Sequence, residues 1–133
     1  DCPRDIPEEE LAKKIEAMAS QVKDMRNCIF NFHCPPYDTQ LDAAPKLDQD
    51  LKPLVRGGNV VMYPAGSSAV RSAIEKYQPL LGLHGHIHES RGIFRIGRTI
   101  CLNPGSEYNE GILRGVIVNL KNASVKSYLF ISG

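Results

Sequence analysis

The sequence predicts an α/β domain, and three patterns support that prediction. A helical pattern of apolar residues occupies positions 7–25, a second one lies at 68–78, and strand-like segments fill the second half of the chain. The chain has 133 residues, of which 42% are hydrophobic, and a chain of that length and composition can bury a sizeable core. We therefore expect residues 1–133 to form one compact unit.

The first predicted helix covers residues 7–25. Its apolar residues recur at steps of four and three, which places them on one face of a helix; they are Leu11, Ile15, Met18, Val22 and Met25. Pro7 suits the first turn, and the glutamates at 8–10 suit the positive end of the helix dipole. A short buried strand is expected next, at 27–33, and the following Pro-Pro pair would end it abruptly.

The middle of the chain combines a loop and a second helix. Residues 34–58 are rich in proline and in scattered charges, and we expect a long surface loop with one helical turn near 47–51. Ser67 or Ser68 would then cap a helix that ends before Pro79.

The remaining predicted elements are short strands. They lie at 60–63, 80–83, 92–96, 99–102, 115–120 and 124–131. Tight turns at 97–98 and 121–123 would join two of the pairs. We expect the strands of the second half to form a meander.

The charge balance argues against two classes of partner. Sixteen Lys and Arg against fifteen Asp and Glu give a formal net charge of +1, which favours neither nucleic acid nor an acidic membrane surface as the main partner. No apolar run approaches the roughly 20 residues that cross a bilayer, and the first residues lack the pattern of a signal peptide. None of the cysteines forms a C-x-x-C pair. We expect a cytoplasmic protein with reduced thiols at Cys2, Cys28, Cys34 and Cys101.

Three of the four histidines lie together in the segment HGHIHES, residues 84–90. Side chains two residues apart in a strand project from the same face, so His86 and His88 could share a metal or serve two adjacent ones. His84 has the same parity, and Gly85 would leave room for a close approach. The alternative is a solvated strand end, which an arbitrary H-x-H segment more often is.

His33 strengthens the case for a metal. It ends the predicted strand at 27–33, where the following prolines turn the chain out of the sheet. Sites in α/β proteins are built at such strand ends. Taken alone, His33 would more often be a core or edge residue. Two strand ends that both carry histidines indicate zinc or a similar metal.

Two further motifs have simple structural interpretations. The segment NPGS at 103–106 is composed of turn residues and predicts a tight turn. Arg91, Arg95 and Arg98 could bind a phosphate through their guanidinium forks, but alternating arginines on a hairpin more often form a solvated face. We do not assign these arginines to substrate binding from the sequence.

Four ordered segments resemble the calcineurin-like metallophosphoesterase superfamily, in particular its Icc-related predicted phosphoesterases. They are NFHCPP, LHGHIHES, RGIFRIGRTICLNPGSEYNEG and LRGVIVNL, and together they extend over nearly the whole chain. The G-H-x-H element at 85–88 is the most specific part. The resemblance implies a four-layer α/β/β/α sandwich that holds two divalent metals drawn from Mn, Fe, Zn or Ni, with Mn favoured.

The resemblance also implies residue roles. His33 and His86 would ligate the second metal, His88 would ligate the first, and His84 would line the pocket or have only a structural role. A turn that packs under the site would be formed by Asn103, Pro104, Gly105 and Ser106. The implied reaction is hydrolysis of a phosphomonoester or phosphodiester by a hydroxide that two metals activate. No residue of the chain is identified as the general acid.

The chain departs from the family pattern in its first half. The D-x-H, G-D-x-x-D and G-N-H-[DE] segments that supply the other ligands do not occur, and three imidazoles cannot satisfy two metals. The chain also opens on Asp1 and not on Met. We therefore expect the C-terminal half of such an enzyme, inactive or weakly active alone. It would need its N-terminal half, a complementing chain or self-association.

Two alternatives remain open at this point. The chain could be a scaffold or binding module that kept the fold and lost the chemistry. It could also be a mononuclear zinc protein that uses His33, His86 and His88 and keeps an open fourth position. The presence of all three downstream ligand positions favours the phosphoesterase.

Overall fold

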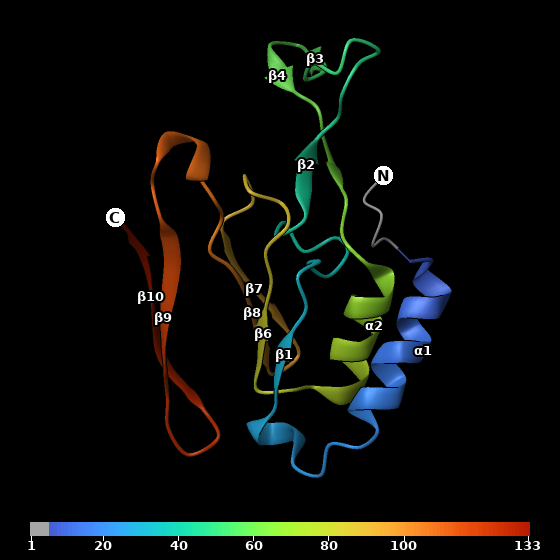
Figure 1. Ribbon diagram of the computed structural model, residues 1–133, viewed down its shortest axis with the longest axis vertical. Helices are drawn as coiled ribbons and strands as arrows, with labels where there is room; N and C mark the ends of the chain where they lie inside the picture. Colours follow the sequence, from blue (N-terminus) through green and yellow to red (C-terminus); the bar gives the residue numbers. More distant parts are fainter. Residues whose placement is uncertain (1–5) are drawn as a thin grey trace.

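The computed structural model describes residues 6–133, which form three layers (Figure 1). Helices α1 (Glu8–Ala19) and α2 (Ser68–Tyr77) make one layer, and a four-stranded sheet makes the next. A hairpin of β9 (Arg114–Leu120) and β10 (Val125–Ser132) covers the other face of the sheet. The predicted mixed α/β class is thereby confirmed.

The central sheet has the strand order β1-β6-β8-β7. Its strands are β1 (Ile29–Asn31), β6 (Leu81–Leu83), β7 (Gly92–Ile96) and β8 (Thr99–Asn103). Strands β1, β6 and β8 run parallel, whereas β7 runs antiparallel to β8. The carboxyl ends of the three parallel strands therefore meet at one edge of the sheet.

The predicted meander is wrong, although the strand positions in the second half are close to those expected. Strand β8 pairs with β6 in parallel as well as with β7, and β9 pairs only with β10 among the described strands. All five residues of β8 are buried. Cys101 faces the helices, whereas Ile100 and Leu102 face the hairpin. A strand covered on both faces lacks the apolar–polar alternation of a half-exposed strand, so its sequence does not show which strands lie beside it.

Helix α1 is shorter than the predicted helix at 7–25. It ends at Ala19, and Met25 instead begins a separate 3₁₀ turn, η1 (Met25–Asn27). Ile15 and Ala19 are buried, but Met18 is 60% exposed. Because α1 packs mainly against α2 (Figure 1), only a narrow stripe of it is covered.

Helix α2 begins where the sequence predicts. The Ser67 hydroxyl accepts a hydrogen bond of 3.1 Å from the backbone N–H of Val70, which satisfies one of the free N–H groups of the first turn. The carboxylate of Glu8 accepts from the Ser67 hydroxyl at 2.8 Å and from the N–H of Ala69 at 2.8 Å. The first turn of α1 thus also caps α2, and it holds the two helices in register.

The predicted loop at 34–58 is largely an arm that projects from the body (Figure 1). Its two short antiparallel ladders pair β2 (Ala43–Pro45) with β5 (Met62–Pro64), and β3 (Val55–Arg56) with β4 (Asn59–Val60). In place of the helical turn expected near 47–51, the chain makes a tight turn in which the N–H of Leu51 donates to the carbonyl of Asp48 at 3.1 Å, and a bridge between Leu47 and Pro53 closes it. A second 3₁₀ turn, η2 (Tyr108–Glu110), lies between β8 and β9.

The other sequence expectations have simple outcomes. No helix within residues 6–133 is long and apolar enough to cross a membrane. Cys28 and Cys101 form no disulfide, and burial raises the pKa of the Cys101 thiol to about 12. Cys2 lies outside the described residues.

Candidate metal-binding site

The predicted histidines lie at the carboxyl edge of the parallel strands. His33 follows the end of β1, and His86 follows the end of β6. These two strands are neighbours, and the backbone N–H of Gly85 donates to the carbonyl of His33 at 2.9 Å. In open α/β sheets this edge is the usual place for ligand binding.

The imidazole rings of His33 and His86 lie next to each other. Their centroids are 5.3 Å apart and their planes meet at 76°. Both residues are exposed, so solvent ions reach them. Gly85 lies against the pair, since a Cβ at this position would be 3.3 Å from Nδ1 of His33. A larger residue at 85 would crowd the His33 ring.

The backbone at His86 has an unfavourable conformation. Its φ is 64°, and the N–H of Ile87 donates across it to the carbonyl of Gly85 at 2.7 Å. A hydrogen bond between residues two apart, with positive φ at the central residue, is a strained type of γ-turn. Strain of this kind persists only where the surroundings impose it, and it concentrates at functional sites.

His88 lies apart from the His33–His86 pair. Its ring packs edge to face on Tyr108, with centroids 5.5 Å apart. The parity argument fails here because β6 ends at Leu83 and the segment 84–90 is not a strand. Within residues 6–133 there is no group of three or more His, Cys, Asp or Glu side chains that could hold a metal ion. The three histidines therefore do not form one complete site.

His84 is buried and faces inward. Its Nδ1 lies 2.9 Å from the carbonyl oxygen of Phe32 and 3.2 Å from that of Cys34, so Nδ1 carries the proton and donates. Burial lowers the pKa of His84 to about 4, although these carbonyl contacts oppose the shift. Its Nε2 is buried and has no hydrogen-bond partner. The neutral ring ties the end of β6 to the segment that carries His33.

The NPGS turn contacts the histidine segment directly. The side-chain amide of Asn103 is buried and donates to the carbonyl of Ile87 at 3.0 Å and to that of Leu41 at 3.1 Å. The Asn103 side-chain oxygen accepts from the N–H of Gly105 at 2.9 Å. The N–H of Ser106 donates to the carbonyl of His88 at 3.1 Å. This turn therefore holds the backbone that follows the strained residue His86. Pro104 lines a cavity of about 500 Å³ beside His33.

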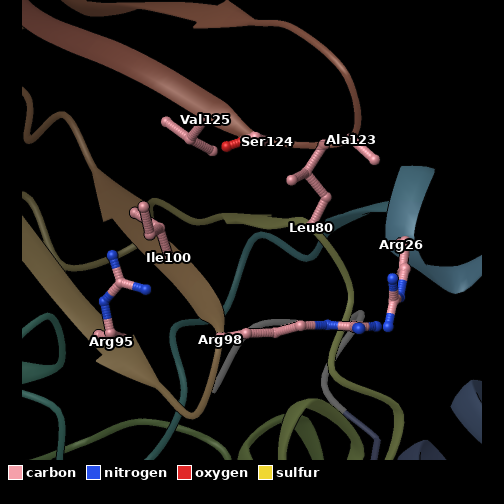
Figure 2. Close-up of a pocket in the computed structure, with 8 residues that line it drawn as sticks. All are labelled: Arg26, Leu80, Arg95, Arg98, Ile100, Ala123, Ser124 and Val125. Atoms are coloured by element: carbon pink, nitrogen blue, oxygen red, sulfur yellow. The ribbon is translucent and has the colours of Figure 1, made fainter.

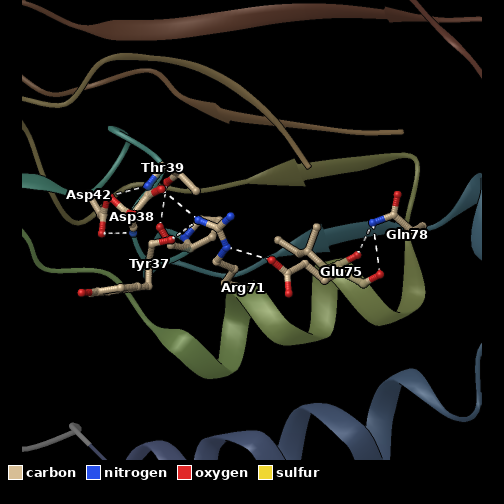
Figure 3. A network of polar contacts seen from close by, with 9 residues as sticks. Tyr37, Asp38, Thr39, Asp42, Arg71, Glu75 and Gln78 are labelled. Atoms are coloured by element: carbon tan, nitrogen blue, oxygen red, sulfur yellow. Dashed lines mark hydrogen bonds and ion pairs between the residues drawn. The ribbon is translucent and has the colours of Figure 1, made fainter. Parts of the chain in front are cut away.

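A second network, which sequence reasoning missed, fixes the loop after His33 (Figure 3). The buried carboxylate of Asp42 accepts hydrogen bonds of 2.8, 3.0 and 2.9 Å from the N–H groups of Asp38, Thr39 and Gly66. From α2, Arg71 donates to the carbonyls of Tyr37 and Asp38 at 2.9 Å each. The only sequence signal was a lone acidic residue between Leu41 and Ala43 in an apolar stretch.

The chain is similar to one protein of known sequence and to one of known structure, but no protein-family model matches it. The chain is 35% identical over 104 residues to the uncharacterized protein MJ1162 of Methanocaldococcus jannaschii, and the match covers 77% of this chain but 40% of that protein. A crystal structure aligns with 95% of this chain and 36% of its own chain, at a TM-score of 0.51 and 23% identity. That likeness concerns the fold. The chain thus spans well under half the length of both proteins.

Proposed function

We propose that the sheet edge with His33 and His86 forms part of a divalent-metal centre in a metallophosphoesterase. The perpendicular ring pair, 5.3 Å between centroids, is the observation that carries this proposal. The strained backbone of His86 and the anchored loops on both sides support it, because a metal site needs ligands held in fixed positions.

The histidines of this chain can supply some of the ligands of such a centre, but not all of them. Imidazole nitrogens suit Zn, Fe and Ni, whereas Mn also needs the carboxylates that are missing here, and the neighbouring rings can approach one cation. Two cations at about four to six ligands each need more donors than three imidazoles. The remaining ligands, including carboxylates, would come from outside residues 6–133. This fits the larger size of the matching proteins, of which the chain covers 40% and 36%.

The chain offers surfaces where such a complementing segment could pack. Strand β1 forms one edge of the central sheet, and its Ile29 is 42% exposed. The hairpin exposes Ile117, Leu129 and Ile131. Open strand edges and apolar faces favour association. We propose that the other half of the same protein, a complementing chain or a second copy covers them.

The four histidines and Asn103 each have a defined part in this proposal. The cations, when bound, would neutralise phosphoryl oxygens and lower the pKa of a bound water. His33 and His86 would hold one cation, and His88 would serve the other. His84 is a positioning residue that fixes the His33 segment, and Asn103 fixes the backbone next to His86. The substrate would be a phosphomonoester or phosphodiester.

Hydrolysis of p-nitrophenyl phosphate and bis(p-nitrophenyl) phosphate with Mn(II) tests the proposal. The protein used is one that contains this chain together with its complementing half. His86→Ala and His33→Ala should each abolish hydrolysis, while Lys121→Ala in the exposed β9–β10 turn should leave it unchanged. Full activity of His86→Ala would refute the proposal. Tight binding of one zinc by the 133-residue chain alone would favour the mononuclear alternative.

A further inference from the structure

A second cavity lies at the end of the sheet opposite the histidines (Figure 2). Its volume is about 350 Å³, which falls in the range of small-molecule sites, about 300–1,000 Å³. It forms where β6 and β8 begin and where the β9–β10 turn folds over them. We call it the arginine pocket, and its lining residues are Arg26, Leu80, Arg95, Arg98, Ile100, Ala123, Ser124 and Val125.

Three guanidinium groups from separate segments reach this pocket. Arg26 comes from η1, Arg95 from β7, and Arg98 from the turn between β7 and β8. Figure 2 shows the side chains of Arg98 and Arg26 extending toward each other. None of the ion pairs formed by residues 6–133 includes any of the three. Three positive charges that line one cavity would stabilise an anion there.

Arg98 is held in place by contacts outside the pocket. Its Nε donates to the carbonyl of Gln78 at 2.7 Å, and its backbone N–H donates to the Gln78 side-chain oxygen at 2.8 Å. Gln78 is itself fixed, because its amide donates to the carbonyl of Ile74 at 2.8 Å. The remaining guanidinium nitrogens of Arg98 are thus oriented before any ligand arrives. A pre-oriented guanidinium fork matches the geometry of a phosphate.

Apart from Ser124, the rest of the pocket wall is apolar. Leu80, Ile100 and Val125 lie beside the arginines, with the Ser124 residue between the apolar wall and the β9–β10 turn (Figure 2). Arg91, the third arginine of the β7 region, lies elsewhere, over the ring of Phe130 at 4.8 Å from its centroid. The three arginines of the β7–β8 region are therefore not one solvated stripe. Arg91 contacts an aromatic ring, whereas Arg95 and Arg98 line the pocket.

We propose that the arginine pocket binds a small phosphorylated organic molecule, with the phosphates on Arg26, Arg95 and Arg98 and an apolar or ring portion against Leu80, Ile100 and Val125. A nucleotide has this combination of groups. The site is independent of the histidine edge, because the two lie at opposite ends of the parallel strands.

Isothermal titration calorimetry with ATP, pyrophosphate and adenosine, all in EDTA, tests the proposal on the 133-residue chain. ATP should bind more tightly than pyrophosphate, and adenosine should bind weakest. Arg98→Ala and Arg26→Ala should each weaken ATP binding at least about 10-fold, as the loss of a charge-assisted hydrogen bond predicts. Arg56→Ala, which removes a guanidinium from the exposed arm, should leave the affinity unchanged.

A second readout keeps the test decisive if an alanine variant folds poorly. Arg98→Lys keeps the charge and loses the fork, and it should bind ATP with reduced affinity and only a small change in Tm. In ¹H–¹⁵N spectra, ATP should shift the amide signals of Arg98, Ser124 and Val125. Failure of ATP and pyrophosphate to bind at millimolar concentration would overturn the proposal. So would unchanged affinity in Arg98→Ala, or shifts confined to residues 84–90. His86→Ala should not alter ATP binding in EDTA, which separates this result from the fate of the metal site.

Discussion

The rings of His33 and His86 meet edge to face, with centroids 5.3 Å apart, although the residues belong to separate segments of the chain. The contact follows from the parallel pairing of β1 with β6, which aligns Asn31 with Leu83. Each strand then delivers a histidine to the same edge within a few residues. Sheet topology, and not sequence proximity, creates the pair.

Gly85→Ala should weaken metal binding and leave the fold intact. A Cβ at this position would lie 3.3 Å from Nδ1 of His33, so the His33 ring must move by a few tenths of an ångström. We expect a several-fold loss of Zn(II) affinity, measured by competition with a chromophoric chelator, and little change in Tm. Gly92→Ala is the matched control, because its Cβ would meet Leu41 at an ordinary 3.5 Å. Equal affinities for both variants would contradict the proposed role of His33.

Gly82→Ala should destabilise the protein. The new Cβ would lie 2.7 Å from Nε2 of His84 and 3.2 Å from Sγ of Cys101, and the buried His84 ring is held by its contacts with backbone carbonyls. Overpacking of this kind costs about 1–3 kcal/mol, which urea denaturation would detect as a lower midpoint at an unchanged slope. A variant as stable as the wild type would show that the His84 ring is free to move.

The stability of the chain should fall in acid because of His84. Its folded pKa is about 4, against about 6.5 in an unfolded chain. Between these values the unfolded state binds a proton that the folded state does not, so the free energy of unfolding decreases as the pH falls. The stabilisation is complete above pH 6.5 and is lost progressively toward pH 4. The loss amounts to roughly 3 kcal/mol for a shift of this size.

Urea denaturation in EDTA at several pH values measures this dependence. His84→Asn keeps a donor near the carbonyls of Phe32 and Cys34 but does not titrate. It should be less stable than the wild type at pH 7 and show a flatter pH dependence between pH 7 and 4. Parallel curves for the two proteins would rule out His84 as the source.

Asn103→Asp should loosen the histidine segment. The carboxylate cannot donate to the carbonyls of Ile87 and Leu41, which the amide contacts at 3.0 and 3.1 Å. Leaving buried groups unsatisfied costs about 1–3 kcal/mol. Hydrogen exchange should quicken at Ile87 and Ser90, whose N–H groups donate to Gly85 and Ile87, while the amides of β10 should keep their protection. Unchanged exchange at Ile87 would contradict the anchoring role.

Local signals predicted more of the fold than long-range ones did. Helix α2 was predictable because Ser67 caps it and its apolar residues follow helical spacing. The end of α1 was not, because Val22 and Met25 continue the helical spacing of apolar residues although α1 ends at Ala19 and Met25 begins η1. The parallel pairing of β6 with β8 leaves no trace in either sequence, since neither strand alternates between apolar and polar residues in a way that identifies its neighbours.

In the candidate site, too, local signals in the sequence predicted more than long-range ones did. Histidines at two strand ends pointed to one edge of the sheet, and the structure brings His33 and His86 together there. The position of His88 could not be predicted, because the positive φ of His86 interrupts the alternation that a strand would impose. Asp42 went unnoticed, since its three N–H donors come from residues that only the folded loop assembles.

The most direct test of the central claim is the effect of Mn(II) on the histidine ring signals in the NMR spectrum of this chain. Mn(II) is paramagnetic and broadens the signals of nuclei close to it, even when it binds weakly. At substoichiometric Mn(II), the ring signals of His33 and His86 should broaden together and first, ahead of those of His84, and His33→Ala should relieve the broadening at His86. Broadening that begins elsewhere, or at His86 regardless of His33, would contradict the shared metal site.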